Sequence, residues 1–177
     1  MSKPTVATIW LDGCSGCHMS FLDLDERLIE LSAHFDLVYS PLVDLKVLPS
    51  HVDIALVEGS VSNEDDERKI KLVRSRVQTL ISLGDCAVTG NVPAMRNPFS
   101  VDSLFDRAYL ENATLQQQRP TTRVPALLAR VRPIHEVVPV DICVPGCPPS
   151  ADTIYTILTE LLAGRVPDIA ALSRFGA

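Results

Sequence analysis

Five cysteines are the residues of this 177-residue chain with the clearest capacity for chemistry. Cys14 and Cys17 form a Cys-x-x-Cys pair, Cys86 stands alone in mid-chain, and Cys143 and Cys147 lie close together near the carboxyl end. The N-terminus shows neither a cleavable signal nor a twin-arginine pair, so we expect a cytoplasmic protein. Cytoplasmic cysteines rarely form disulfides, and clustered ones more often bind metals or undergo redox chemistry. The cysteines therefore predict a metal or redox site.

The residues around the cysteines suit a site that exposes backbone N–H groups. Gly16 lies inside the first pair, and Gly146 directly precedes Cys147. Glycine permits unusual backbone angles. In iron–sulfur proteins, N–H groups of such loops donate hydrogen bonds to the sulfurs of the cluster and tune the reduction potential of the cluster. Pro148 and Pro149 then stiffen the chain. We expect Cys147 to be a ligand for this reason.

The spacing of the thiols favours an iron–sulfur cluster over two alternatives. Structural zinc usually takes its ligands as two close pairs, whereas here Cys86 and Cys147 are far from the first pair and from each other. A dithiol enzyme leaves these two cysteines unexplained. Four thiolates from three loops fit one [4Fe–4S] cluster. Cys143 is then a thiol just outside the ligand set, or simply a buried one.

Hydrophobic patterns along the chain alternate between strand and helix. Short runs of apolar and β-branched residues predict strands at residues 5–11, 35–43, 52–57, 78–83 and 136–140. Helical patterns cover residues 18–32, 63–76, about 101–110, and a last helix from Ser150 to a stop at Gly164. A proline-rich excursion spans 91–125. We expect one domain over residues 1–177, an α/β flavodoxin-like doubly wound sheet of about five parallel strands with helices on both faces.

Ligands of such sheets sit beyond the carboxyl ends of the strands, and every cysteine is predicted to lie in a loop at that edge. Glu58 ends a buried strand at the same edge, where it either handles protons or accepts hydrogen bonds from a loop. His18 directly follows Cys17 and is either a hydrogen-bond donor to the cluster or an ordinary first-turn helix residue.

Net charge and the length of the apolar runs argue against two kinds of partner, nucleic acid and the membrane interior. The formal net charge of −6 argues against nucleic acid, which rewards basic patches. No apolar run approaches the roughly 18 residues needed to cross a bilayer, so we expect no membrane insertion.

The motifs Cys14-x-Gly-Cys17, Gly84-x-Cys86-Ala-x-x-Gly90 and Cys143-Val-Pro-Gly-Cys147-Pro-Pro, in this order, resemble the small subunit of [NiFe] hydrogenases. The resemblance implies that Cys14, Cys17, Cys86 and Cys147 hold the proximal [4Fe–4S] cluster. It also implies a large-subunit partner that carries the nickel–iron site and splits hydrogen. The chain itself lacks the paired motifs that hold nickel.

Two departures from many family members point to one subfamily. The chain has no cysteine after Cys147, so we expect a single cluster, and it shows no export signal. Both features resemble the small subunit of cytoplasmic NAD-reducing hydrogenases, which implies diaphorase partners bearing FMN and iron–sulfur clusters. The alternative is a subunit of a complex I-like or formate-linked oxidoreductase, but Ser15 and Gly16 separate cysteines that are adjacent in the complex I relative.

A flavin in this chain is the remaining cofactor to weigh, because the predicted fold resembles flavodoxin. Flavodoxin-type sites use a Ser- and Thr-rich phosphate loop after the first strand, and Cys14 to Cys17 occupy that position here. We therefore do not expect FMN in this chain.

Beside the hydrogenase subunit and the complex I-like or formate-linked subunit, a third hypothesis is a zinc-stabilised binding module without an enzymatic role.

Overall fold

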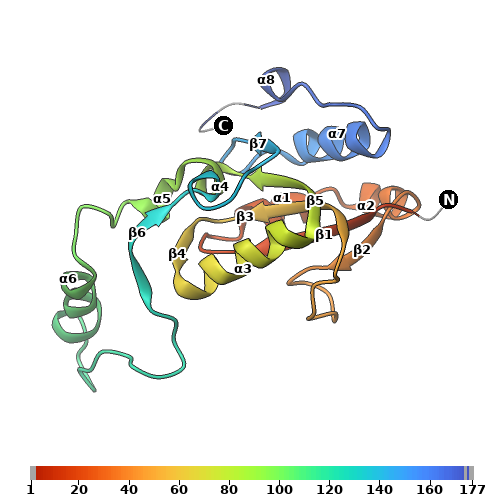
Figure 1. Cartoon of the computed structure of the whole chain (residues 1–177). Coiled ribbons are helices and arrows are strands. Elements are labelled where there is room, and N and C mark those ends of the chain that lie inside the picture. Colours follow the sequence, from red (N-terminus) through yellow and green to blue (C-terminus); the bar gives the residue numbers. More distant parts are fainter. Residues whose placement is uncertain (1–2, 174, 176–177) are drawn as a thin grey trace.

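The computed structural model describes residues 3–173 and 175, and its centre is a parallel sheet (Figure 1). The strand order is β2-β1-β3-β5-β7, which is the order of a flavodoxin-like doubly wound fold. The five strands are β1 (Thr5–Trp10), β2 (Asp36–Tyr39), β3 (Val52–Glu58), β5 (Val77–Leu83) and β7 (Ile142–Val144). All four neighbouring pairs are parallel, so the predicted fold class is confirmed.

Helices cover both faces of the sheet because its strands are apolar on both sides. One face packs against α1 (Gly16–Leu22), α2 (Glu26–Ser32) and α7 (Ala151–Leu162). The other face packs against α3 (Glu64–Arg76) and the segment at residues 134–138. Figure 1 shows α7 and α3 on opposite sides of the sheet. A last short helix is α8 (Ile169–Leu172).

Two predicted helix ends are confirmed by their capping contacts. The Asn63 side chain accepts hydrogen bonds from the N–H groups of Asp65 and Asp66 at the start of α3. Ser150 accepts from the N–H of Thr153 at the start of α7. Each cap satisfies N–H groups that have no partner inside the helix.

The predicted helix over 18–32 is wrong in one respect: it is two helices, α1 and α2. The chain breaks between them at residues 23–25, where Asp25 has a φ of 49°. Apolar spacing carries across this break because both helices turn an apolar side toward the same core, so the pattern alone does not reveal it. The strand predicted at 35–43 is also shorter, at four residues.

The strand predicted at 136–140 is wrong. Residues Ile134–Glu136 form a 3₁₀ turn, η2, and the fifth strand of the sheet is β7 further along the chain. A separate two-stranded antiparallel sheet joins β4 (Val61–Asn63) to β6 (Leu127–Arg132), and neither strand was predicted. The apolar residues after η2 pack into the core without pairing, which explains the false strand pattern.

The excursion at 91–125 contains α5 (Asn91–Ala94), α6 (Val101–Asp106) and a π-helical turn, η1 (Arg107–Glu111). Figure 1 shows α6 standing away from the central sheet. The helix predicted near 101–110 is confirmed, and its start is capped by Ser100, which accepts from the N–H of Ser103.

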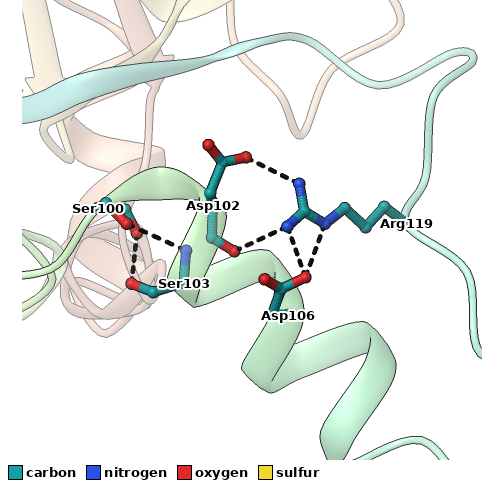
Figure 2. A network of polar contacts seen from close by, with 5 residues as sticks. All are labelled: Ser100, Asp102, Ser103, Asp106 and Arg119. Carbon is teal, nitrogen blue, oxygen red and sulfur yellow. Dashed lines mark hydrogen bonds and ion pairs between the residues drawn. The ribbon is translucent and has the colours of Figure 1, made fainter.

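A guanidinium on the returning chain closes this excursion (Figure 2). Arg119 donates to Asp102 at 2.8 Å through Nη1 and to Asp106 at 3.0 Å through Nε. One side chain thus ties the returning part of the excursion to α6.

The helices are short on the scale of a lipid bilayer. Within the part of the chain that the structure describes, none is both long and apolar enough to span a membrane.

Candidate iron–sulfur site

One row of residues crosses the carboxyl edge of the sheet. Trp10 is in register with Glu58, Glu58 with Leu83, and Leu83 with Val144. The chain leaves β1, β5 and β7 at this row, and a cysteine follows each exit within four residues or fewer. The parallel register therefore delivers cysteines from three distant stretches of sequence to one place.

The thiols of four cysteines lie close enough to influence one another. Burial raises the pKa of the Cys17 thiol far above its ordinary value, and the carboxylate of Glu58 raises it further. The other contributors to that rise are the thiols of Cys86, Cys14 and Cys147. Burial likewise raises the pKa of Cys86, again with Cys14 and Cys147 contributing. Burial therefore favours the protonated form of the Cys17 and Cys86 thiols until a cation or cluster binds them.

A glycine makes room for the most buried of these sulfurs. Gly84 has a φ of 84°, and a Cβ added there would overlap the Sγ of Cys17. Gly16 is less restricted, since a Cβ there would lie 3.2 Å from the Sγ of Cys14. Gly16 is predicted to be a loop residue, but it is the first residue of α1; its predicted role beside the cluster stays a prediction.

The loops that carry Cys86 and Cys147 are fastened to each other. The N–H of Asp85 donates to the carbonyl of Gly146 at 2.8 Å, and the N–H of Gly146 donates back to Asp85 Oδ1 at 2.7 Å. The N–H of Gly84 donates to the carbonyl of Val144 at 2.8 Å. This ladder sets the two cysteines at a fixed separation, and the sequence pattern gave no sign of the role of Asp85.

Glu58 is almost fully buried, with 2% of its surface exposed, and it accepts a hydrogen bond from the backbone N–H of His18 at 2.8 Å. Its Oε2 also lies 3.1 Å from Nδ1 of His18. Of the two roles predicted for Glu58, the structure shows the acceptance of a backbone hydrogen bond, from the first turn of α1 instead of a loop. The carboxylate thereby holds the chain directly after Cys17.

His18 lies in the first turn of α1 and is 4% exposed. Its ring stacks on Trp10 with centroids 5.5 Å apart. Among the described residues, neither ring nitrogen has a partner in hydrogen-bond geometry. The ring therefore packs against Trp10 beside the site, and its role as a hydrogen-bond donor to the cluster stays a prediction.

The prediction that every cysteine lies in a loop is wrong for three of them. Cys17 and Cys86 occupy first turns of α1 and α4 (Asp85–Thr89), and Cys143 lies in the middle of β7 in register with Ser82. Cys143 is exposed and belongs to the strand, whereas Cys147 comes after the strand has ended.

The chemistry of the donor set decides which group it can hold. In residues 3–173 and 175, no three His, Cys, Asp or Glu side chains are grouped so as to hold one metal ion. The four gathered sulfurs, the glycines that face them and the soft character of thiolate fit an iron–sulfur cluster. Cys14, Cys17, Cys86 and Cys147 are the residues that would hold it.

Residues 14–161 match the family model described as the NADH ubiquinone oxidoreductase 20 kDa subunit. The chain belongs to this family. The chain is 41% identical to the delta subunit of the NAD-reducing hydrogenase HoxS of Cupriavidus necator, over 98% of this chain and 86% of that one. It is 37% identical to a subunit of the F420-non-reducing hydrogenase of Methanothermobacter marburgensis, over 92% of this chain.

Solved structures agree with the sequence matches. A chain of the NAD⁺-reducing [NiFe] hydrogenase in its H₂-reduced state superposes with a TM-score of 0.92 at 40% identity, covering 98% of this chain and 99% of that one. In sequence and in fold, the chain thus matches the small subunit of NAD-reducing [NiFe] hydrogenases, which is an oxidoreductase subunit. The predicted resemblance is confirmed. The [NiFeSe] hydrogenase of Desulfovibrio vulgaris, at 16% identity and a TM-score of 0.58, shares the fold.

The matched relatives differ in length. The chain spans most of the C. necator protein but only 54% of the M. marburgensis one. The family resemblance therefore covers the sheet and the four-cysteine edge, while the longer relatives carry additional sequence.

Proposed function

We propose that this chain is the electron-relay subunit of an NAD-reducing [NiFe] hydrogenase. In this proposal one [4Fe–4S] cluster binds Cys14, Cys17, Cys86 and Cys147. The observation that carries it is the strand register that brings the chain to one edge of the sheet before Cys14, Cys86 and Cys147, where the Cys17 sulfur packs against Gly84. When bound, a cluster of this type accepts and releases single electrons.

The solvent exposure of the four cysteines suits an electron-relay role. Cys17 and Cys86 are half-buried, whereas Cys14 and Cys147 are exposed. The site is thus sheltered on the sheet side and open on the other. The open side is where we place the nickel–iron large subunit, because electron transfer requires the redox centres to be close.

Exposed apolar side chains next to the site suit a partner surface. Val92, Met95 and Phe99 follow the Cys86 helix and expose 62%, 71% and 59% of their surfaces. Large exposed apolar groups of this kind are typical of protein interfaces. We assign this patch to the large subunit, with diaphorase subunits bearing FMN and iron–sulfur clusters taking the electrons on to NAD. We further propose that residues 1–177 act as one iron–sulfur domain in a cytoplasmic complex.

One alternative keeps the cluster and changes the partner. The matching family model is named for a subunit of NADH:ubiquinone oxidoreductase, which supports a complex I-like or formate-linked assembly. Nickel in the purified complex separates the two, since only the hydrogenase contains it.

The test is anaerobic purification of the complex through a tag on this chain, with wild type beside Cys86→Ser. We expect nickel, hydrogen-dependent reduction of NAD, and about four more irons per complex in wild type than in the variant. Equal iron in wild type and Cys86→Ser, with zinc bound to this chain, would overturn the cluster. A cluster in a complex without nickel would support the complex I-like assembly instead.

A further inference from the structure

Asn91 contacts one of the proposed ligands through its side chain. Its amide nitrogen Nδ2 lies 3.6 Å from the Sγ of Cys147, within hydrogen-bond distance for a sulfur acceptor. Asn91 is the first residue of α5, where the 91–125 excursion begins. Nothing in the cysteine spacing pointed to it.

A second donor comes from the next residue. The backbone N–H of Val92 hydrogen-bonds the Cys86 sulfur and opposes the rise that burial causes in the pKa of that thiol. Two consecutive residues, Asn91 and Val92, therefore donate to the sulfurs of two different cysteines, Cys147 and Cys86.

The backbone at this point adopts uncommon angles to do so. Gly90 has a φ of 85° and Asn91 a φ of 31°. Asparagine tolerates positive φ better than most side chains, and glycine adopts it freely. The turn is also anchored by the N–H of Gly90, which donates to the carbonyl of Cys86 at 3.0 Å.

We propose that Asn91 is a positioning residue that raises the reduction potential of the cluster by donating its amide hydrogen to the Cys147 sulfur. This inference rests on the proposed function, because it needs a cluster on Cys147. A donor on a ligand sulfur stabilises the cluster with the additional electron more than the cluster without it. Removing the donor therefore favours the oxidised form.

Asn91→Gly is the sharpest variant. It removes the amide while leaving a residue that adopts positive φ without strain, so the backbone of the turn is kept. Asn91→Asp keeps the shape of the side chain, removes both donor hydrogens and adds a negative charge beside the sulfur. The expected order of reduction potentials is wild type, then Asn91→Gly, then Asn91→Asp as the lowest.

Asn97→Ala is the matched control. Asn97 lies in the same excursion and exchanges hydrogen bonds with the backbone of Val131, at 3.0 and 2.7 Å. Its loss loosens the excursion without removing a donor to sulfur. We expect the reduction potential to stay at the wild-type value in this control.

The measurement is a dithionite titration of the purified complex at poised potentials, followed by electron paramagnetic resonance of the cluster on this chain. At a fixed potential, Asn91→Gly should lower the ratio of reduced to oxidised cluster about threefold to tenfold, which is about 30–60 mV for one electron. Iron is determined on the same samples.

Three outcomes count against the inference. A fully loaded Asn91→Gly complex with the wild-type potential overturns it, and so does a shift of equal size in Asn97→Ala. Loss of iron from both Asn91 variants, with wild type loaded, assigns Asn91 to cluster assembly instead. Absence of iron from wild type overturns the proposed function itself, so the two failures are distinguishable.

Discussion

Gly84 faces the sulfur of Cys17 so closely that a Cβ at residue 84 would overlap the Sγ atom. The contact joins the exit of β5 to the first turn of α1, which are far apart in the sequence. It explains why a glycine precedes Asp85 and Cys86, and it leads directly to a substitution test.

Gly84→Ala should deplete the cluster. The added methyl group must displace Cys17, and alanine is also strained at a φ of 84°. We expect iron in the complex to fall markedly while far-ultraviolet circular dichroism stays similar. Gly164→Ala is the control, because Gly164 also has positive φ but no atom of the described residues lies within 4 Å of its added Cβ. If Gly84→Ala binds iron like wild type, the close packing does not constrain Cys17.

Serine substitutions separate the proposed ligands from the fifth cysteine. Cys14→Ser, Cys17→Ser, Cys86→Ser and Cys147→Ser should each lower the iron content and alter the cluster's paramagnetic signal. Cys143→Ser should leave both nearly unchanged, because Cys143 is an exposed residue within β7. The ligand choice is wrong if Cys143→Ser loses iron and Cys147→Ser does not.

Glu58 should prove important for stability through its acceptor oxygen. Glu58→Ala leaves the buried N–H of His18 without its acceptor at a cost of about 2 kcal/mol. Glu58→Gln retains an acceptor oxygen, so its thermal midpoint should lie much nearer to wild type. The measurement is thermal unfolding of the complex by differential scanning fluorimetry. Equal destabilisation by the two variants would indicate that the charge of Glu58, and not its hydrogen bond, matters.

Asp53 should give stability that depends on pH. It accepts from the N–H and the hydroxyl of Thr5, both at 2.7 Å, and these bonds hold the pKa of Asp53 below its ordinary value. A lowered folded-state pKa stabilises the fold above the unfolded value of about 3.9, and the benefit disappears as pH falls through the folded-state pKa.

Asp53→Asn should therefore lower the stability by about 1 kcal/mol at pH 7, a modest figure because the carboxylate is partly solvent-exposed. The difference from wild type should shrink on acidification below pH 4. Thermal unfolding of both proteins across this range measures it. A difference that is constant with pH would contradict the assigned cause.

Arg119 should control the order of the excursion and not the fold as a whole. It bridges Asp102 in the first turn of α6 and Asp106 at the end of that helix (Figure 2). Arg119→Ala should speed hydrogen exchange over residues 100–111 and leave β3 and β5 unaffected. Arg119→Lys keeps the charge but cannot reach both carboxylates as a planar fork, so it should restore protection only in part. Unchanged exchange in Arg119→Ala would show that the excursion is held elsewhere.

Local patterns in the sequence were sufficient for much of the fold. β1, β3, β5, α3 and α7 are each signalled by their own residues, because buried strands are continuously apolar and helix starts carry capping side chains. The pairing of β4 with β6 is different. It joins residues 61–63 to 127–132, and neither segment has enough regular apolar alternation to reveal a strand without its partner.

The sequence by itself determined the chemistry: the five thiols, the glycines beside them and the strand ends from which they follow. Only the tertiary structure decided that Trp10, Glu58, Leu83 and Val144 form one row, that Cys143 belongs to a strand, and that Asn91 reaches the Cys147 sulfur. The physical reason is range. Residue type and spacing act within a few positions, whereas register and side-chain contact depend on which distant segments pack together.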